Sequence, residues 1–524
     1  MHVICAQSIY AAGLRIPRYT PVMTDAAWTR LAAAPQPSLG ELFAAEPDRV
    51  ERLSLTEAGI YFDFAKTHLS QEALAAFLQL AGEMELAAKR DAMFAGEIVN
   101  PSEDRAAEHS AERGQGSPES VAHAQGLHFR MRALIDAIEA EAFGPVRHIL
   151  HIGIGGSALG PHLLVDALGR DEGRYEVAIV SNVDGVALED AIRRFDPHTT
   201  LIAIASKTFT TKETMLNAAS ALQWLEEAGV DDPFGKVIAL TASPDKAIEW
   251  GVDETRILPF PESVGGRYSL WSSIGFPAAL ALGWDAFESL LEGAAAMDRH
   301  FRFAPLEANA PVLAAFVDRY YANVRGAETR AVFAYDERLR LLPSYLQQLE
   351  MESNGKSAGL DGEPVPRATA PILWGGTGTD AQHAVFQLLH QGTHLVPVEF
   401  IAAVEPGDRL DPEHHRQLLL NAFAQGAALM AGKASDDPAR FYPGDRPSTS
   451  ILLDRLDPAT LGALIAFYEH RVFANAALLG INPFDQFGVE LGKQMANQLD
   501  NQSALAFDAS TGALLRRAFG DETE

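Results

Sequence analysis

Short apolar runs alternate with helix-like segments through most of the chain, and this alternation constrains the fold more than any other feature. Between residues 148 and 243 the runs are HILHIGI, YEVAIVSNV, TLIAIAS and KVIALTAS, each followed by a helical pattern or a turn. The same order resumes later in TRAVFAY, APILWGG and LVPVEFI. Strands that alternate with helices form parallel sheets with helices on their faces. The sequence therefore predicts an α/β protein with two such units.

The first hundred residues have a different pattern, with helical periodicity in EALAAFLQLAGEMELAAKRDAMF followed by the polar stretch NPSEDRAAEHSAERGQGSPES. We expect an N-terminal helical region at 1–119, a first α/β domain at 120–280, a second at 281–505 and a polar C-terminal tail at 506–524. A helix is expected in MTDAAWTRLAA, which begins at Met23, and the residues before it could be a loosely attached extension.

Composition limits the classes of partner. The 524 residues are 47% hydrophobic and 21% charged, which is typical of a globular protein, and the net charge of −28 argues against non-specific binding to nucleic acid or anionic membrane. Cys5 is the only cysteine, so an intramolecular disulfide or a thiolate pair for zinc is excluded. The N-terminus lacks a secretory pattern and no apolar run approaches a membrane span. We expect a cytoplasmic protein.

The first glycine turn, HIGIGGSALGPH, follows a predicted strand and precedes a predicted helix. Gly153, Gly155 and Ala158 satisfy the G-x-G-x-x-G/A pattern of dinucleotide sites. The acidic residue expected about 20 positions on is poorly placed, because the next strand ends only at Asp184. The glycines also let backbone amides approach a smaller anion, to which Ser157 would add a hydroxyl. A tight turn without a ligand is the third alternative.

A second candidate for anion binding is SKTFTTKET, which follows the apolar run LIAIA. Thr210 and Glu213 have the spacing of a capping box and predict a helix start at that point. Hydroxyl groups surround this start, at Ser206, Thr208, Thr211 and Thr214, and Lys207 adds a positive charge. A phosphate monoester suits this cluster because donors and helix dipole both favour an anion. The alternative is that the threonines only cap the helix.

A candidate base lies in LLPSYLQQLEMESNGKS, which predicts a short helix with Pro343 in its first turn and Gly355 at its end. The apolar stripe consists of Leu342, Leu346 and Leu349. Glu352 lies at the edge of this stripe, and Gln348 lies one turn away on the same face. A carboxylate partly shielded in this way could act as a base near neutral pH. The alternative is an exposed glutamate at a helix end.

Three further charged or titratable residues are candidates. Arg267 follows two glycines in GGRYSLWSSIGF and suits a phosphate or an oxyanion, although a lone arginine is more often a surface ion-pair partner. His383 lies beyond a second glycine turn, in PILWGGTGTDAQHAVFQLL, where an imidazole could exchange protons. Lys493 follows Gln486 in DQFGVELGK and could assist a proton transfer or be solvated.

Several stretches together resemble the glucose-6-phosphate isomerase (phosphoglucose isomerase) family. They occur in the family's order: MFAGEIVNPSEDRAAEH, HIGIGGSALGP, SKTFTTKET, GGRYSLWSSIG, MESNGKS, TDAQHAVFQLLHQGT and NPFDQFGVELGK. The resemblance implies a small and a large sugar-isomerase α/β sandwich domain, with the N-terminal region packed on the large one. It implies reversible isomerisation of glucose 6-phosphate and fructose 6-phosphate in glycolysis and gluconeogenesis, in a homodimer whose active site lies near the subunit interface. No metal, nucleotide or other cofactor is implied.

The resemblance also implies roles for individual residues. The substrate, chiefly its phosphate, would be held by Gly156, Ser157, Ser206, Lys207, Thr208 and Thr211. Glu352 would move a proton between C2 and C1 through a cis-enediol, and Arg267 would stabilise the negative charge that develops. His383 from the partner subunit and Lys493 would assist ring opening, while Gln348 and Gln486 would orient the sugar and phosphate.

The chain departs from the family pattern at Ala158, where aspartate is frequent, at Asp380-Ala381, where Asn-Gly is common, and at Phe487, where tryptophan is frequent. These changes put loop geometry and tolerance of related sugars in question. Two rival functions stay open: a non-catalytic sugar-phosphate sensor, which would not need Glu352, His383 and Lys493 together, and a nicotinamide-dependent dehydrogenase, which would need a ribose-binding acid. A bifunctional isomerase that also accepts mannose 6-phosphate is an alternative within the enzyme class.

Overall fold

The computed structural model describes residues 25–170, 173–501 and 507–520. Cys5 and the residues before Met23 lie outside these ranges, so the expectations about them stay predictions. The chain divides into two compact units, Met1–Pro483 and Phe484–Glu524, which we describe separately.

The first sheet has five parallel strands in the order β4-β3-β5-β6-β7. The strands are β3 (His148–Gly153), β4 (Glu176–Val180), β5 (Thr200–Ala205), β6 (Val237–Thr241) and β7 (Ile257–Pro259). Every residue of β5 and β6 is buried, because helices cover both faces of the sheet. This burial explains why these strands are continuous apolar runs in the sequence. The four predicted strands are confirmed, whereas the three-residue β7 was not predicted.

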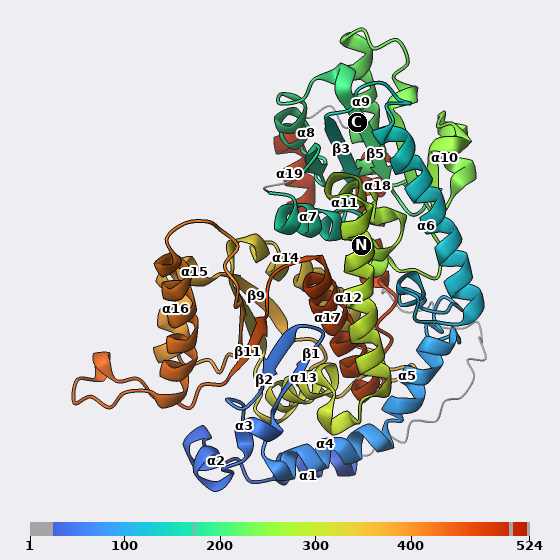
Figure 1. Ribbon diagram of the computed structural model, residues 1–524. Coiled ribbons are helices and arrows are strands. Elements are labelled where there is room, and N and C mark those ends of the chain that lie inside the picture. Colours follow the sequence, from blue (N-terminus) through green and yellow to red (C-terminus); the bar gives the residue numbers. More distant parts are fainter. Residues whose placement is uncertain (1–24, 171–172, 502–506, 521–524) are drawn as a thin grey trace. The chain divides into compact units, whose positions relative to one another are not determined.

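Helices on either side of this sheet follow the predicted alternation (Figure 1). They are α6 (Pro118–Glu139), α7 (Gly156–Leu168), α8 (Gly185–Ile192), α9 (Lys212–Glu227), α10 (Pro244–Trp250) and α11 (Phe276–Leu282). Leu188 of α8 and Leu225 of α9 pack with Ile152 and Ile204 in one core cluster, so α8 and α9 cover one face. Helix α7 contacts β3 and β4 and also packs against α11. The carboxyl ends of β3 and β5 lead directly into α7 and towards α9, which places both predicted anion sites at one edge.

The second sheet has six strands in the order β1-β2-β11-β10-β8-β9. The strands are β1 (Ser54–Glu57), β2 (Ile60–Asp63), β8 (Thr329–Tyr335), β9 (Ile372–Thr377), β10 (Val398–Ala403) and β11 (Ser448–Leu453). Strands β8, β9 and β10 are parallel, as predicted. Strand β11, which was not predicted, pairs in parallel with β10, while β1 and β2 form an antiparallel hairpin that pairs with β11. The helical pattern of the N-terminal region did not predict this hairpin. Its turn at Ala58 and Gly59 has positive φ at both residues, as tight hairpin turns require.

Helices pack on both sides of the second sheet (Figure 1). On one side, α15 (Gly378–Gln391) and α16 (Pro412–Ala431) enclose a core that contains Phe333, Phe386 and Phe400. The remaining long helices are α12 (Trp284–Phe303), α13 (Ala310–Arg319) and α17 (Pro458–Leu479), and α17 is buried from Thr460 to Leu479. Helix α14 (Leu342–Gln347) leads into a π-helical turn, Gln348–Glu352, and a second π-helical turn spans Tyr320–Val324.

The N-terminal region is mainly helical, as its periodicity predicted, and its described part contains five α-helices in addition to the hairpin. They are α1 (Asp25–Ala33), α2 (Leu39–Ala45), α3 (Arg49–Arg52), α4 (Gln71–Glu83) and α5 (Leu86–Ala95). Short 3-10 turns span Ala111–Arg113, Pro197–Thr199, Phe234–Lys236, Glu254–Arg256, Gly266–Trp271, Ser273–Gly275, Leu306–Ala308, Glu337–Leu339 and Pro438–Arg440. The predicted domain boundaries stay predictions, while the α/β class with two parallel-rich sheets is confirmed.

The second unit, Phe484–Glu524, is helical where it is described. It contains a 3-10 turn (Phe487–Val489), α18 (Glu490–Asn501) and α19 (Ala509–Phe519). Helix α19 lies in the segment 506–524 that was expected to be only a polar tail. The side chain of Asp508 accepts hydrogen bonds from the backbone amides of Ser510 and Thr511 and so caps this helix.

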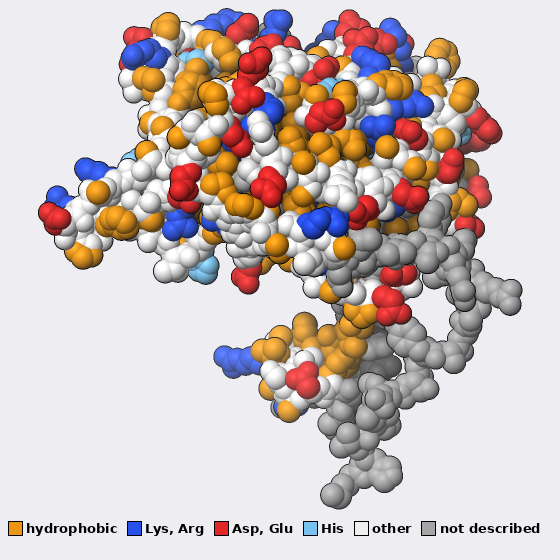
Figure 2. Space-filling model, turned by 90° about the horizontal axis from the view of Figure 1, so that it is seen from below, with side chains coloured by type: hydrophobic (Ala, Val, Ile, Leu, Met, Phe, Trp, Pro, Cys, Tyr) orange, Lys and Arg blue, Asp and Glu red, His pale blue; other side chains and the backbone are white. Residues whose placement is uncertain are grey.

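Acidic and basic side chains are interspersed with apolar ones on the face shown in Figure 2, so the net charge of −28 is not gathered there. None of the helices within the described ranges is long and apolar enough to cross a membrane.

Candidate active site

The two segments that were predicted to bind an anion begin side by side at the carboxyl edge of the first sheet. Strands β3 and β5 are neighbours, and Gly153 is paired with Ala205 at their ends. The glycine turn continues from Gly153 and the hydroxyl-rich segment continues from Ala205. Because ligands of open α/β sheets bind beyond the carboxyl ends of the strands, this edge is the expected place for a ligand.

The glycine turn packs directly against the segment that carries Arg267. Gly155 has a φ of +58° and precedes the first residue of α7. A Cβ atom on Gly156 would lie 2.1 Å from the carbonyl oxygen of Gly266 and 2.6 Å from the backbone nitrogen of Arg267. No side chain forms a cap hydrogen bond at the start of α7, and Ser157 lies half-buried in its first turn. The turn therefore combines a close backbone contact with amides that are suited to an anion.

His151, on strand β3, forms a hydrogen bond with the backbone of this turn. The sequence did not predict this contact. The side chain of His151 is fully buried, and its Nε2 lies 2.6 Å from the carbonyl oxygen of Ser157. Because a carbonyl oxygen only accepts, Nε2–H is the donor. Burial lowers the pKa of His151 to about 4, although this hydrogen bond opposes the shift. The imidazole is therefore neutral near pH 7 and holds the first turn of α7 in place.

We expect His151→Gln to weaken the pH dependence of stability. Between about pH 6.5 and 4 the unfolded chain binds a proton on this imidazole that the folded chain does not, so the free energy of unfolding falls as the pH falls, by up to about 3 kcal/mol. Glutamine can donate a similar hydrogen bond without titrating. Between pH 6.5 and 4.5 the Tm of the wild-type protein should fall more than the Tm of the variant. The exposed His123→Gln variant is the control and should follow the wild type; equal slopes for all three proteins would contradict the assignment.

The hydroxyl-rich segment forms its own hydrogen bonds before α9 begins. Ser206 Oγ and Thr211 Oγ1 are 3.0 Å apart, and Thr210 Oγ1 donates to Thr208 Oγ1 over 2.9 Å. The predicted capping box of Thr210 and Glu213 is wrong, because Thr211 is the N-cap residue of α9 and the Thr210 hydroxyl is used within the loop. The Thr211 side chain makes no cap hydrogen bond. The start of α9 is thus a second helix N-terminus suited to an anion.

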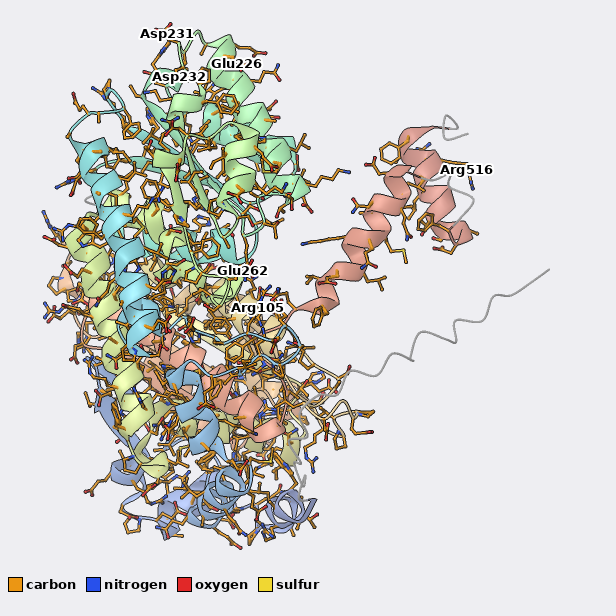
Figure 3. The ribbon with its side chains drawn as sticks, turned by 90° about the vertical axis from the view of Figure 1, so that its right-hand side faces the viewer. Arg105, Glu226, Asp231, Asp232, Glu262 and Arg516 are labelled. Carbon is orange, nitrogen blue, oxygen red and sulfur yellow. The ribbon has the colours of Figure 1, made fainter. Side chains whose placement is uncertain are left out.

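The ammonium group of Lys207 points to the loop that precedes Gly265. It donates to the carbonyl oxygens of Glu262 over 2.7 Å and Val264 over 3.4 Å. Burial and the nearby Arg105 lower its pKa, and Arg105 in turn forms an ion pair with the Glu262 carboxylate at 3.1 Å (Figure 3). Lys207 therefore ties the hydroxyl-rich segment to this loop, and its contact with phosphate stays a prediction.

The contacts that orient Arg267 include three oxygen atoms. Its side chain is almost wholly buried, and Nε donates to Ser353 Oγ over 2.6 Å while one terminal nitrogen donates to the carbonyl oxygen of Pro483 over 2.5 Å. The other terminal nitrogen lies 3.5 Å from a carboxylate oxygen of Glu352. The guanidinium is therefore oriented with one nitrogen towards this carboxylate. Sequence alone left open whether Arg267 was only a surface ion-pair partner, and its burial excludes that alternative.

Glu352 lies at the end of a helix that changes from α to π geometry. Leu342, Leu346 and Leu349 are buried as predicted, but Gln348–Glu352 is π-helical, which the sequence did not predict. Such turns are rare in proteins, and many of those that occur lie at functional sites. The Glu352 side chain is 19% exposed. Lys356 Nζ donates to the carbonyl oxygens of Glu352 and Ser353 over 3.0 and 2.8 Å, which holds the end of the turn.

A second carboxylate on the same turn, that of Glu350, has different surroundings from the carboxylate of Glu352. Glu350 is buried and is held by Arg330 at 3.4 Å and by the amide of Asn354 at 3.2 Å. The Glu350 carboxylate therefore has a structural role, whereas the Glu352 side chain is partly exposed to solvent. Gln348 approaches the glycine turn: its Nε2 would lie 3.0 Å from a Cβ atom on Gly155.

The structure thus brings together the glycine turn with Ser157, the start of α9, Arg267, Gln348 and Glu352. A carboxylate beside a fixed guanidinium can accept a proton from a carbon acid while the cation stabilises the resulting oxyanion. Two helix N-termini nearby suit a dianionic phosphate. This arrangement fits proton transfer on a phosphorylated substrate.

Three further residues were predicted for the site: His383, Gln486 and Lys493. His383 lies exposed on α15, beside the second sheet, where it lines a groove of about 520 Å³ with Gln382, Phe386, His390 and Tyr442 among others. Gln486 and Lys493 belong to the second unit, before its 3-10 turn and in the first turn of α18. The roles of all three stay predictions. No group of three His, Asp or Glu side chains in the described part of the chain is arranged to hold a metal ion.

Comparison with known proteins identifies the family of the chain. A family profile described as phosphoglucose isomerase matches residues 63–515. A glucose-6-phosphate isomerase of Rhizorhabdus wittichii is 72% identical over 500 residues, which cover 95% of this chain and 100% of that protein. The corresponding protein of Zymomonas mobilis is 64% identical over 495 residues, 94% of this chain and 98% of that protein. The crystal structure of a glucose-6-phosphate isomerase from Chlamydia trachomatis superposes with a TM-score of 0.85 at 30% identity and covers 94% of this chain and 98% of that chain.

Proposed function

The chain belongs to the phosphoglucose isomerase family, and from this membership we propose that it interconverts glucose 6-phosphate and fructose 6-phosphate, a step of glycolysis and gluconeogenesis. The observation that carries the proposal is the Arg267–Glu352 pair at 3.5 Å, which lies beside the glycine turn. The enzyme is an aldose–ketose isomerase that needs a proton shuttle and charge stabilisation. We place it in the cytoplasm as a homodimer.

In this mechanism the Glu352 carboxylate removes the proton from C2 of the open-chain aldose. The electron pair of the C2–H bond forms the C1–C2 double bond, and O1 takes up negative charge and then a proton, which gives a cis-enediol. Loss of the O2 proton forms the C2 carbonyl, while Glu352 returns its proton to C1. Arg267 stabilises the oxyanions on either side of the enediol, a contribution that pre-oriented groups make at little reorganisation cost.

Substrate binding is assigned to the two helix N-termini. The phosphate contacts Gly156, Ser157, Ser206, Lys207, Thr208 and Thr211, with Gln348 and Gln486 orienting the substrate. His383 from a second subunit and Lys493 open the sugar ring. The exposure of His383 on α15 supports a role across a subunit interface, because a residue that acts in another subunit has to lie on the surface of its own.

The test is incubation of the purified protein with fructose 6-phosphate in deuterated water without added cofactor, followed by NMR. Glucose 6-phosphate with deuterium at C2 is the expected product. Binding without conversion or exchange would favour the sensor, and conversion only after addition of a nicotinamide nucleotide would favour the dehydrogenase. Mannose 6-phosphate in the same spectra would identify a bifunctional isomerase.

The cross-subunit role of His383 predicts that two inactive variants complement each other. We expect His383→Gln and Glu352→Gln homodimers each to have little activity. In a hybrid dimer with one subunit of each kind, one of the two sites would combine an intact Glu352 with an intact His383. A hybrid purified through two different affinity tags should therefore have about half the activity of the wild-type dimer.

The two doubly tagged parental homodimers are the controls for this experiment. A hybrid as inactive as its parents would show that His383 acts within its own subunit. A fully active monomer in sedimentation experiments would also contradict the proposal.

A further inference from the structure

Ser353 follows the proposed base directly in the chain, and its side chain is fully buried. Its hydroxyl oxygen accepts a hydrogen bond from Arg267 Nε over 2.6 Å and lies 3.0 Å from the hydroxyl oxygen of Tyr268. Burial raises the pKa of Tyr268 to about 12, so this phenol is neutral near pH 7. Two adjacent residues, Glu352 and Ser353, thus contact the same guanidinium through different atoms.

Individual contacts of Arg267 have different geometric consequences. The bond to the Pro483 carbonyl oxygen fixes one terminal nitrogen, and the guanidinium carbon lies 5.3 Å from the centroid of the Tyr268 ring. The bond from Nε to Ser353 fixes a second point of the plane. With two points fixed, the remaining terminal nitrogen is held 3.5 Å from Glu352. Without the serine oxygen, a buried N–H of a cation would lack this acceptor, which is costly.

We propose that Ser353 is a positioning residue for Arg267: it sets the plane of the guanidinium so that one nitrogen faces Glu352 and the oxyanion formed there. This inference rests on the proposed isomerase function. Ser353 acts through Arg267 and does not itself contact the substrate. A misoriented guanidinium would still leave the phosphate sites intact, so the effect should fall on turnover more than on substrate binding.

The test is a double-mutant cycle with Ser353→Ala and Arg267→Lys, with turnover measured as isomerisation and as C2 exchange in deuterated water. Ser353→Ala should lower kcat by about 10- to 100-fold, the range of a hydrogen bond to a charged group, with KM changed less than about threefold. Lysine has an ammonium group in place of the planar guanidinium, so Ser353 would have no plane to orient in this variant. In the Arg267→Lys background, Ser353→Ala should therefore change kcat by less than about threefold.

Ser273→Ala is the matched control, because Ser273 is also buried and donates to a backbone carbonyl, that of Leu258, over 3.0 Å. Its kcat should stay within about twofold of the wild-type value. If Ser353→Ala does not fold, Ser353→Cys keeps a weak acceptor of similar size, and its loss of kcat should likewise disappear in the Arg267→Lys background. Equal losses in both backgrounds, or an unchanged kcat, would overturn the proposal. Failure of the isomerase function would appear separately, as absence of conversion by the wild-type protein.

Discussion

Glu352→Gln is expected to lower kcat by at least about 10³-fold while KM stays within about threefold of the wild-type value, since the base that carries the proton is lost but the binding groups are not. Glutamine has nearly the shape of glutamate and can accept a hydrogen bond from Arg267, so the packing of the π-helical turn should be kept. It cannot accept a proton from C2 at neutral pH. The loss should therefore concern the chemical step.

The measurement is the rate of deuterium incorporation at C2 of glucose 6-phosphate, together with the rise in Tm on addition of fructose 6-phosphate. The variant should lose the exchange and keep the rise in Tm, because a ligand that binds the folded state raises its stability whether or not it reacts. Near-normal C2 exchange would refute the assignment of Glu352 as the base. A lost Tm rise would show that the carboxylate is needed for binding.

Much of the fold could be predicted because its strands are local, continuous apolar runs. Strands β3, β5 and β6 are buried on both faces, so their sequences leave little ambiguity. The hairpin of β1 and β2 could not be predicted in this way. Its strands have four residues each and β1 is only partly buried. Its place is decided by pairing with β11, nearly 400 residues further along the chain, which no local pattern encodes.

In the site, too, some features follow from local sequence patterns and others depend on contacts between distant segments. The glycine turn and the hydroxyl-rich segment were predictable because each follows a strand directly, and adjacent parallel strands bring such segments together. The contact of Arg267 with Glu352 joins segments about 85 residues apart and depends on a π-helical turn. The direction of the Lys207 ammonium also depends on tertiary structure, because its carbonyl acceptors lie in a different loop. The sequence therefore predicted which segments lie in the site, whereas the tertiary packing determines which side chains contact one another.

Gly156→Ala is expected to lower kcat/KM by at least about 10²-fold and to lower the Tm by several degrees. The new Cβ atom would lie 2.1 Å from the Gly266 carbonyl oxygen and 2.6 Å from the Arg267 nitrogen. Both are backbone atoms, so neither can give way as the end of a flexible side chain could, and overpacking of this kind costs about 1–3 kcal/mol or more. The segment that carries Arg267 would have to shift, and a displacement of about 1 Å at a catalytic group can cost 10²-fold in rate.

Gly185→Ala is the matched control for this prediction. Gly185 is the first residue of α8, after β4 of the same sheet, as Gly156 is the first residue of α7 after β3. A Cβ atom on Gly185 would meet no atom within 4 Å. This variant should keep kcat/KM within about twofold and have an equal or slightly higher Tm, because alanine favours a helix over glycine by up to about 1 kcal/mol. If both alanine variants behaved like the wild type, this result would show that the close packing of the glycine turn on the Arg267 segment does not orient Arg267.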